Sequence, residues 1–155
     1  MKLSRKADYA LRVLFTLARE RDADGPVPVR QLALKNAIPR KFLEAIMRDL
    51  RELDLVESTA GKNGGYCLKR SPAEITIGEI LRAFDGHIGD HSDEDSALPP
   101  ELAAAEGPAC VQRILREIGE TVDRMMDDAT LESVLRGFSL AQPPEMESYV
   151  HGHGI

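Results

Sequence analysis

Basic and polar side chains gather at three places in the first 64 residues, and their chemistry suits contact with phosphate groups and base edges. Guanidinium and ammonium groups bind phosphate oxygens and the acceptor edge of guanine, while a carboxylate accepts from the amino group of cytosine. Hydroxyl, amide and backbone N–H groups add hydrogen bonds to the sugar-phosphate chain. The sequence therefore predicts double-stranded DNA as a partner, contacted by Lys2, Ser4, Arg5, Arg40, Lys41, Arg48, Lys62, Asn63 and Gly64.

The charge of the chain is divided between its two halves. The net charge is −6, but residues 1–70 hold 15 Lys and Arg against 9 Asp and Glu, whereas residues 71–155 hold 5 against 17. A basic module attracts a polyanion, and an acidic module stays solvated. This distribution favours a nucleic-acid-binding first half joined to a second half with another task.

Residues 29–50 have the pattern of two short helices joined by a sharp corner. In the first helix Val29, Leu32 and Ala33 recur at helical spacing. The second is expected to begin at Pro39, where a missing N–H costs nothing, and its apolar face is Phe42, Leu43, Ile46, Met47 and Leu50. Such a pair is a helix-turn-helix whose second helix enters the major groove. Two-helix corners also occur in ordinary helical cores, so the flanking elements must distinguish a DNA-binding helix-turn-helix from such a core.

The flanking segments complete a winged helix. Ser4 is expected to cap a first helix that supplies the main core stripe, and the basic residues around it are either phosphate contacts or a solvated terminus. Strands near Leu55 and Tyr66, with glycines between them, form a hairpin that serves as the wing. Another helix begins at Thr76, where Glu79 completes a capping box. The expected fold is mainly α with a small β-hairpin: a winged helix-turn-helix plus a long dimerisation helix.

A long helix over about residues 108–127 carries apolar side chains at steps of three and four. Few other elements in this half can cover such a seam, so pairing with the same helix of a second chain is expected. Docking on its own domain is the alternative. The interface residues would be Val111, Ile114, Leu115, Ile118, Val122 and Met125.

The sequence divides into four expected parts. Residues 1–86 are expected to form a winged helix, and residues 87–107 an acidic flexible loop. Residues 108–136 are expected to form a dimerisation helix with a short following helix, and residues 137–155 a flexible tail. The loop has no apolar periodicity and is rich in proline and carboxylates. His87 and His91 stand within it, so a metal site and a solvated loop are both open.

Several functional classes are disfavoured. No apolar run approaches the roughly 18 residues of a membrane span, and a secretory signal is missing, so we expect a cytoplasmic protein without a membrane partner. Cys67 and Cys110 stand far apart in sequence, and a reducing compartment disfavours a disulfide between them. Cys110 has no neighbouring histidine and the loop carboxylates have no fixed partners, so an enzyme is not expected.

Four phrases together resemble bacterial winged-helix regulators of the Rrf-two family, which includes iron-sulfur-cluster, nitrite-sensitive and cysteine-metabolism regulators. The phrases are MKLSRKADYALRVL, IPRKFLEAIMRDLRELDLV, GGYCL and ITIGEILRAFDG, and the resemblance covers about residues 1–135. It implies a sequence-specific transcriptional regulator, expected to be a repressor, that binds a palindromic operator as a homodimer. It also implies that helix 39–53 enters the major groove and that Glu44 takes part in reading the site.

The resemblance is incomplete at the sensor and at the wing. Many relatives hold an iron-sulfur cluster with three cysteines and a fourth ligand, but only Cys110 matches here, and Asp8 stands where some members place an acidic ligand. In the wing, Ala60 stands where the family often has arginine, and Lys62 is a partial substitute. The sequence favours a regulator without a cofactor, in which Cys110 is redox-reactive or inert, and leaves a cluster held by Cys110 and Asp8 open.

The alternative function is a protein-interaction module in which the acidic half docks on a partner and DNA binding is vestigial. Besides DNA and a second copy of the chain, a regulatory protein or a small ligand stays open as a partner. Measured binding to duplex DNA would separate the two functions.

Overall fold

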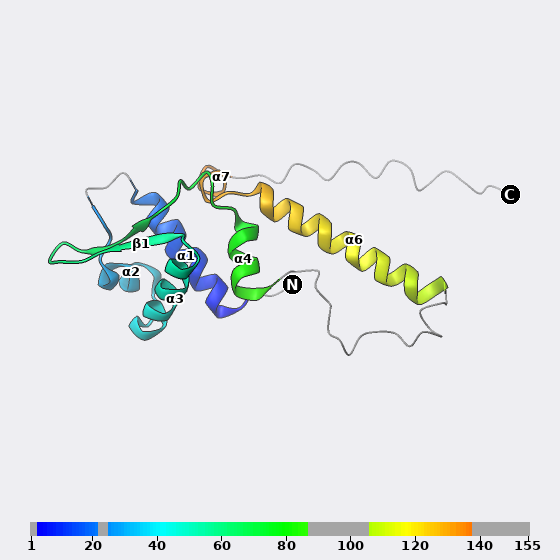
Figure 1. Cartoon of the computed structure of the whole chain (residues 1–155), viewed down its shortest axis with the longest axis horizontal. Coiled ribbons are helices and arrows are strands. Elements are labelled where there is room, and N and C mark those ends of the chain that lie inside the picture. The colour runs from blue at the N-terminus through cyan, green and yellow to red at the C-terminus, as the bar shows by residue number, and fades with distance from the viewer. Residues whose placement is uncertain (1–2, 22–24, 87–105, 138–155) are drawn as a thin grey trace.

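The computed structural model of the chain describes residues 3–21, 25–86 and 106–137. These residues form helices and one antiparallel hairpin. The elements are α1 (Arg5–Arg19), α2 (Val29–Asn36), α3 (Arg40–Glu52), β1 (Val56–Thr59), β2 (Gly65–Leu68), α4 (Ile77–Asp85), α6 (Glu106–Asp128) and α7 (Leu131–Leu135). The first three helices and the hairpin form one body, from which α6 extends away (Figure 1). The expected fold class, a mainly helical winged helix-turn-helix with a small hairpin and a long additional helix, is confirmed.

Helix α1 is the centre of this body, because it contacts α2, α3, α4, α7 and β2. Its expected cap is confirmed: the Ser4 hydroxyl oxygen accepts from the backbone N–H of Ala7 at 3.1 Å. One face of the helix is removed from water through Ala7, Ala10, Val13, Leu14 and Leu17. The other helices therefore pack around the apolar stripe that the sequence predicts.

The corner between α2 and α3 is held by a buried polar pair as well as by apolar packing. Ala37 takes the left-handed conformation, with φ 52° and ψ 42°, and so turns the chain after α2. The preceding Asn36 is buried, and its amide nitrogen donates to the Leu32 carbonyl at 2.9 Å. Its amide oxygen accepts from the Thr16 hydroxyl at 3.0 Å, which ties α2 to α1. Both polar ends of Asn36 are therefore satisfied inside the protein.

Helix α3 differs from its prediction at its first turn. Pro39 occupies the capping position before the helix, which begins at Arg40. Phe42, expected on the apolar face, is 63% exposed, because it lies roughly a quarter turn away from the buried stripe. The remaining predicted positions are buried and join the core, namely Leu43, Ile46, Met47 and Leu50.

The wing is fastened to the body by a third extended segment. Val27 and Tyr66 exchange two backbone hydrogen bonds, of 2.8 and 2.9 Å. A side chain at Gly65 would collide with the Val27 carbonyl, and one at Gly64 would collide with the Thr59 carbonyl. Both glycines are therefore required by the close approach of backbone to backbone.

Helix α7 makes contacts across the expected boundary at residue 86. Its Leu131 is fully buried in the same core cluster as Leu14 of α1. The adjoining backbone is also bonded across the boundary, with Ile77 N–H donating to the Ala129 carbonyl at 2.7 Å. Because these contacts join residues over 50 positions apart, local pattern did not reveal them. By its contacts α7 belongs to the winged helix, although the sequence grouped it with the dimerisation helix.

Two helix caps also differ from expectation. The Thr76 hydroxyl accepts from the backbone N–H of Glu79 at 3.0 Å, as predicted, but the Glu79 carboxylate pairs with Arg70 at 2.6 Å. The reciprocal capping box lies instead between Thr130 and Ser133, where the two bonds measure 3.1 and 2.9 Å. The start of α7 is thus fixed by its own side chains.

Helix α6 begins at residue 106, two positions before the expected start, and so shortens the predicted loop. The rest of that loop with His87 and His91, and the tail from residue 138 onward, lie outside the described residues. Among the helices that the structure describes, none combines the length and the apolar character needed to cross a lipid bilayer.

Candidate nucleic-acid interface

The first turn of α3 exposes two cations side by side. The Arg40 guanidinium donates through Nε to a carboxylate oxygen of Glu44 at 2.8 Å, one turn along the helix. Both side chains are more than half exposed, so this pair adds little to stability. Only Nε is engaged, and the two Nη groups of Arg40 have no partner in the described part of the chain. The two Nη groups form an edge of the guanidinium that can bind guanine or a phosphate group through two hydrogen bonds.

Lys41 and Arg48 continue this exposed face. They are seven residues apart, which is two helical turns, and so lie on the same side of α3. Neither has an ion-pair partner within the described ranges. The core side of the helix is opposite Lys41 and Arg48, which therefore point away from the body, while Arg40 lies on the flank of α3 that borders the hollow beside the wing.

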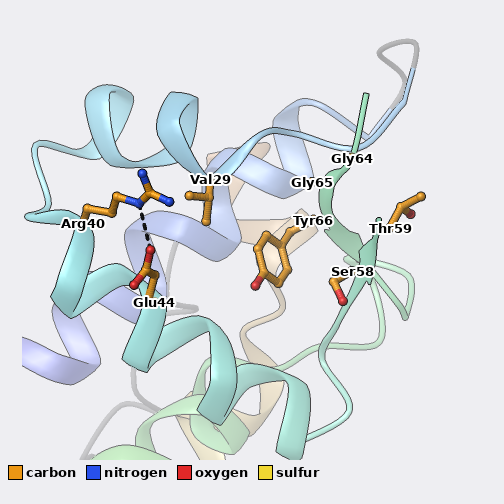
Figure 2. Close-up of a pocket in the computed structure, with 8 residues that line it drawn as sticks. All are labelled: Val29, Arg40, Glu44, Ser58, Thr59, Gly64, Gly65 and Tyr66. Atoms are coloured by element: carbon orange, nitrogen blue, oxygen red, sulfur yellow. Dashed lines mark hydrogen bonds and ion pairs between the residues drawn. The ribbon is translucent and has the colours of Figure 1, made fainter. Parts of the chain in front are cut away.

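An open hollow of about 410 Å³ separates the start of α3 from the wing (Figure 2). Arg40 and Glu44 line one side of it, and Val29 lies at the start of α2. The Tyr66 ring points from β2 into the space between the hairpin and α3. The wing side is lined by Ser58, Thr59, Gly64, Gly65 and Tyr66. Hydroxyl and backbone groups around an open hollow suit the sugar-phosphate strand that separates a major from a minor groove.

The tip of the wing stands clear of the body. Lys62 and Asn63 are exposed there, and the backbone N–H of Gly64 donates to the Gly61 carbonyl at 3.0 Å to close the turn. Lys62 has no ion-pair partner among the residues that the structure describes. An unpaired ammonium on a hairpin tip suits a phosphate contact at the edge of a site.

The start of α1 is joined to α3 by an ion pair that the sequence did not predict. The Lys6 ammonium lies 2.6 Å from the Asp49 carboxylate of α3 and 5.5 Å from the centre of the Phe84 ring. Ser4 uses its hydroxyl as a cap, and its backbone N–H donates to the Asp85 carboxylate at 2.9 Å. Arg5 next to it is exposed, whereas Lys2 lies outside the described residues. The structure therefore joins the start of α1 to one flank of α3 and places the wing beside the other.

The predicted seam on α6 is exposed in the single chain. Ile118 is 54% exposed, and Val111, Ile114 and Leu115 are about as open, although all four are large apolar residues. Val122 and Met125, nearer to the body, are half-buried. Exposed apolar side chains in one row on a helix are typical of a surface for association.

The end of α6 is fixed to α4 by a charged contact. The Arg82 guanidinium donates to the Asp127 carboxylate at 2.5 Å. Gly78 of α4 faces the same carboxylate so closely that a side chain there would collide with it. Because α4 also contacts α1, the position of α6 is tied to the body that α1 centres.

The donor groups of this chain do not fit the cluster that the resemblance implies. The chain has two cysteines, and the Cys67 thiol donates to the Glu57 carboxylate at 3.3 Å within the hairpin. Cys110 lies early in α6, and Asp8 is paired with Arg12 at 2.8 Å. No group of three His, Cys, Asp or Glu side chains that could hold a metal ion occurs among the described residues. Iron-sulfur clusters normally need four ligands, mostly thiolates, and this chain provides too few.

Burial, the hydrogen bond to Glu57 and the charge of that carboxylate together raise the pKa of the Cys67 thiol above its ordinary value. We therefore expect Cys67 to react slowly with iodoacetamide at neutral pH, because the thiolate is the nucleophile. In Glu57→Gln the pH at which alkylation reaches half its maximal rate should fall, yet stay above that of a free cysteine because burial remains. Peptide mapping by mass spectrometry separates Cys67 from Cys110, and an unchanged profile in the variant would contradict the assigned cause.

The chain was compared with protein families and with known proteins. Residues 3–137 match Rrf2, which is the Rrf-two family and is described as an iron-dependent transcriptional regulator. The chain belongs to this family. An Rrf2-like HTH-type transcriptional regulator of Rhodobacter capsulatus is 32% identical over 137 residues, which cover 86% of this chain and 91% of that protein. The HTH-type transcriptional regulator CymR of Bacillus subtilis is 33% identical, covering 86% of this chain and 89% of CymR.

Solved Rrf2 structures show the same arrangement. The structure of CymR, named the global cysteine regulator of B. subtilis, has a TM-score of 0.71 at 30% identity and covers 90% of this chain and 99% of that one. The structure of IscR from T. potens has a TM-score of 0.68 at 25% identity, and the match covers 94% of this chain and 93% of that one. Rrf2 relatives are HTH-type transcriptional regulators and not enzymes, so the chain is a DNA-binding regulator in its family assignment.

Proposed function

We propose that this Rrf2 chain represses transcription as a homodimer bound to a palindromic operator. The observation that carries the proposal is the exposed first turn of α3, where Arg40 and Lys41 stand beside a hollow bordered by the wing. A helix in the major groove with the wing beside the adjoining strand would seat one sugar-phosphate chain in that hollow. Glu44, which shares the hollow, would accept from a cytosine amino group once Arg40 turns toward the DNA.

The homodimer is supported by the exposed seam of α6 and by the rigid junction between α6 and the body. Two α6 helices paired along Val111 to Ile118 would bury apolar side chains that are half open to water in one chain. A two-fold axis through that pair presents two identical α3 helices, which suits half-sites about one turn of DNA apart. An operator read in this way is a palindrome.

We further propose that this regulator works without an iron-sulfur cluster. The chain has too few thiols, and Cys67 is hydrogen-bonded to Glu57 in the wing hairpin. The signal would then reach the protein through a small ligand, a protein partner or oxidation of Cys110. Iron and sulfide analysis of protein purified without oxygen tests this, and stoichiometric amounts of both that disappear in Cys110→Ala would contradict it.

The test of DNA binding is selection of bound duplexes from a random pool, followed by affinity measurements on the selected site. We expect enrichment of a palindrome, and Arg40→Ala or Lys41→Ala should weaken its binding by about 1–3 kcal/mol. Loss of a base contact would relax the preference at one position, while loss of a phosphate contact would reduce the salt dependence.

A matched control for these variants is Arg136→Ala. Arg136 is an exposed cation at the end of α7, and Figure 1 shows α7 on the side of α1 away from α3. The substitution removes the same positive charge, so the affinity of this variant for the selected duplex should stay near that of the unchanged chain. A pool without any enriched sequence would contradict the proposal and favour the protein-interaction module.

A further inference from the structure

Phe42 is an aromatic side chain exposed at the edge of a surface proposed to meet DNA. It is 63% exposed, although Leu43, Ile46 and Met47 on the same helix are at most 2% exposed. Phe42 belongs neither to the core cluster nor to the partly buried side chains packed against it. The fold of the single chain therefore gives this ring no packing role that explains its size.

The position of Phe42 on α3 complements that of Arg40. Lys41 and Arg48 lie near the middle of the exposed face, Arg40 lies on the flank that borders the wing, and Phe42 lies on the other flank. That second flank also carries Asp49, whose carboxylate is taken up by Lys6 of α1. The exposed face thus has a charged edge toward the wing and an apolar edge toward the start of α1.

We propose that Phe42 reads the C5 methyl group of a thymine in the major groove, and so sets the specificity of the operator at one base pair per half-site. The inference rests on the proposed binding of α3 in the major groove. Thymine is the one base of unmodified DNA that presents a methyl group there, and a phenyl ring has no hydrogen-bonding group with which to read the others. Arg40 and Lys41, in the same turn of the helix, would contact polar base edges or phosphates next to that thymine.

The test removes the methyl group from the DNA without changing base pairing. Each thymine of the selected half-site is replaced in turn by deoxyuridine, and affinities are measured for the unchanged chain and for Phe42→Ala. We expect one position at which deoxyuridine weakens binding of the unchanged chain about 4-fold, from the loss of one buried methyl group. Phe42→Ala should bind the thymine and deoxyuridine duplexes equally at that position.

Two further variants make the result specific. Phe42→Leu keeps an apolar contact and should retain part of the preference for thymine. Leu34→Ala shortens another exposed apolar side chain, on α2, and should leave the preference unchanged. Because Phe42 is mostly exposed, the variants should unfold at the same temperature as the unchanged chain.

The outcomes separate this inference from the proposed function. If a palindrome is enriched but no thymine is discriminated from deoxyuridine, or if Phe42→Ala keeps the discrimination, Phe42 has no such role while DNA binding stands. If the unchanged chain selects no duplex, both proposals are overturned.

Discussion

A chain carrying Ile118→Asp should sediment as a monomer and lose about 100-fold or more of its affinity for a palindromic duplex. Ile118 is 54% exposed on the seam of α6, so a carboxylate there meets water in the single chain and leaves its fold intact. In the proposed dimer the two-fold axis would bring two such carboxylates into an apolar interface. Burying them without partners costs several kcal/mol, more than the interface can offset. The affinity falls because each α3 then binds its half-site alone.

Gln112→Asp is the matched control for this experiment. Gln112 is also exposed on α6 and gains the same charge, but it lies about 100° round the helix from Val111 and so off the seam. Analytical ultracentrifugation of both variants, with circular dichroism to verify their folding, gives the comparison. A dimer that persists in Ile118→Asp would place the interface elsewhere, and a monomer in both variants would mean that charge alone dissociates it.

Sequence pattern was sufficient to predict the elements that have a local hydrophobic period or a local turn signal. The stripes of α1 and α3 and the glycine-rich turn of the wing predict their elements because 3.6-residue and two-residue periods need only neighbours. Contacts between distant segments left no such pattern. The Val27 strand beside Tyr66, the Thr16 bond to Asn36 and the burial of Leu131 are each made across 20 residues or more. Only the folded chain shows them.

The candidate site divides in the same way. Residue type and position were enough to place Arg40, Lys41 and Lys62 on the exposed surface, because a charged side chain is rarely buried without a partner. The pairing of charges was not predictable, and neither the Arg40–Glu44 contact nor the Lys6–Asp49 contact follows from composition. Phe42 was assigned to the apolar face of α3 because it recurs at helical spacing with Ile46. Its exposure depends on the angle at which α3 packs on α1.

The proposed sensor without a cluster would set this chain apart from the description of its family. Rrf2 is described as iron-dependent, yet a chain with two cysteines, of which Cys67 is hydrogen-bonded to Glu57, lacks the thiolates for a cluster. Under that proposal, a signal would reach the proposed DNA-binding surface without iron. Helix α6 is fixed to α4 through Arg82 and Asp127, and α4 packs on α1, so a ligand that turns one α6 against its partner would also turn α3.

Leu131→Ala should lower the free energy of unfolding by about 2–5 kcal/mol, although residue 131 lies beyond the long helix. Its side chain is fully buried in the cluster that contains Leu14 and Ile80, and truncation would leave a cavity there. Leu135→Ala, at the half-buried end of α7, should cost less and serves as the control. Urea unfolding at one fixed protein concentration gives both values, because the stability of a dimer depends on concentration. A loss below about 1 kcal/mol for Leu131→Ala would mean that α7 only rests on the winged helix and that the division at residue 86 is real.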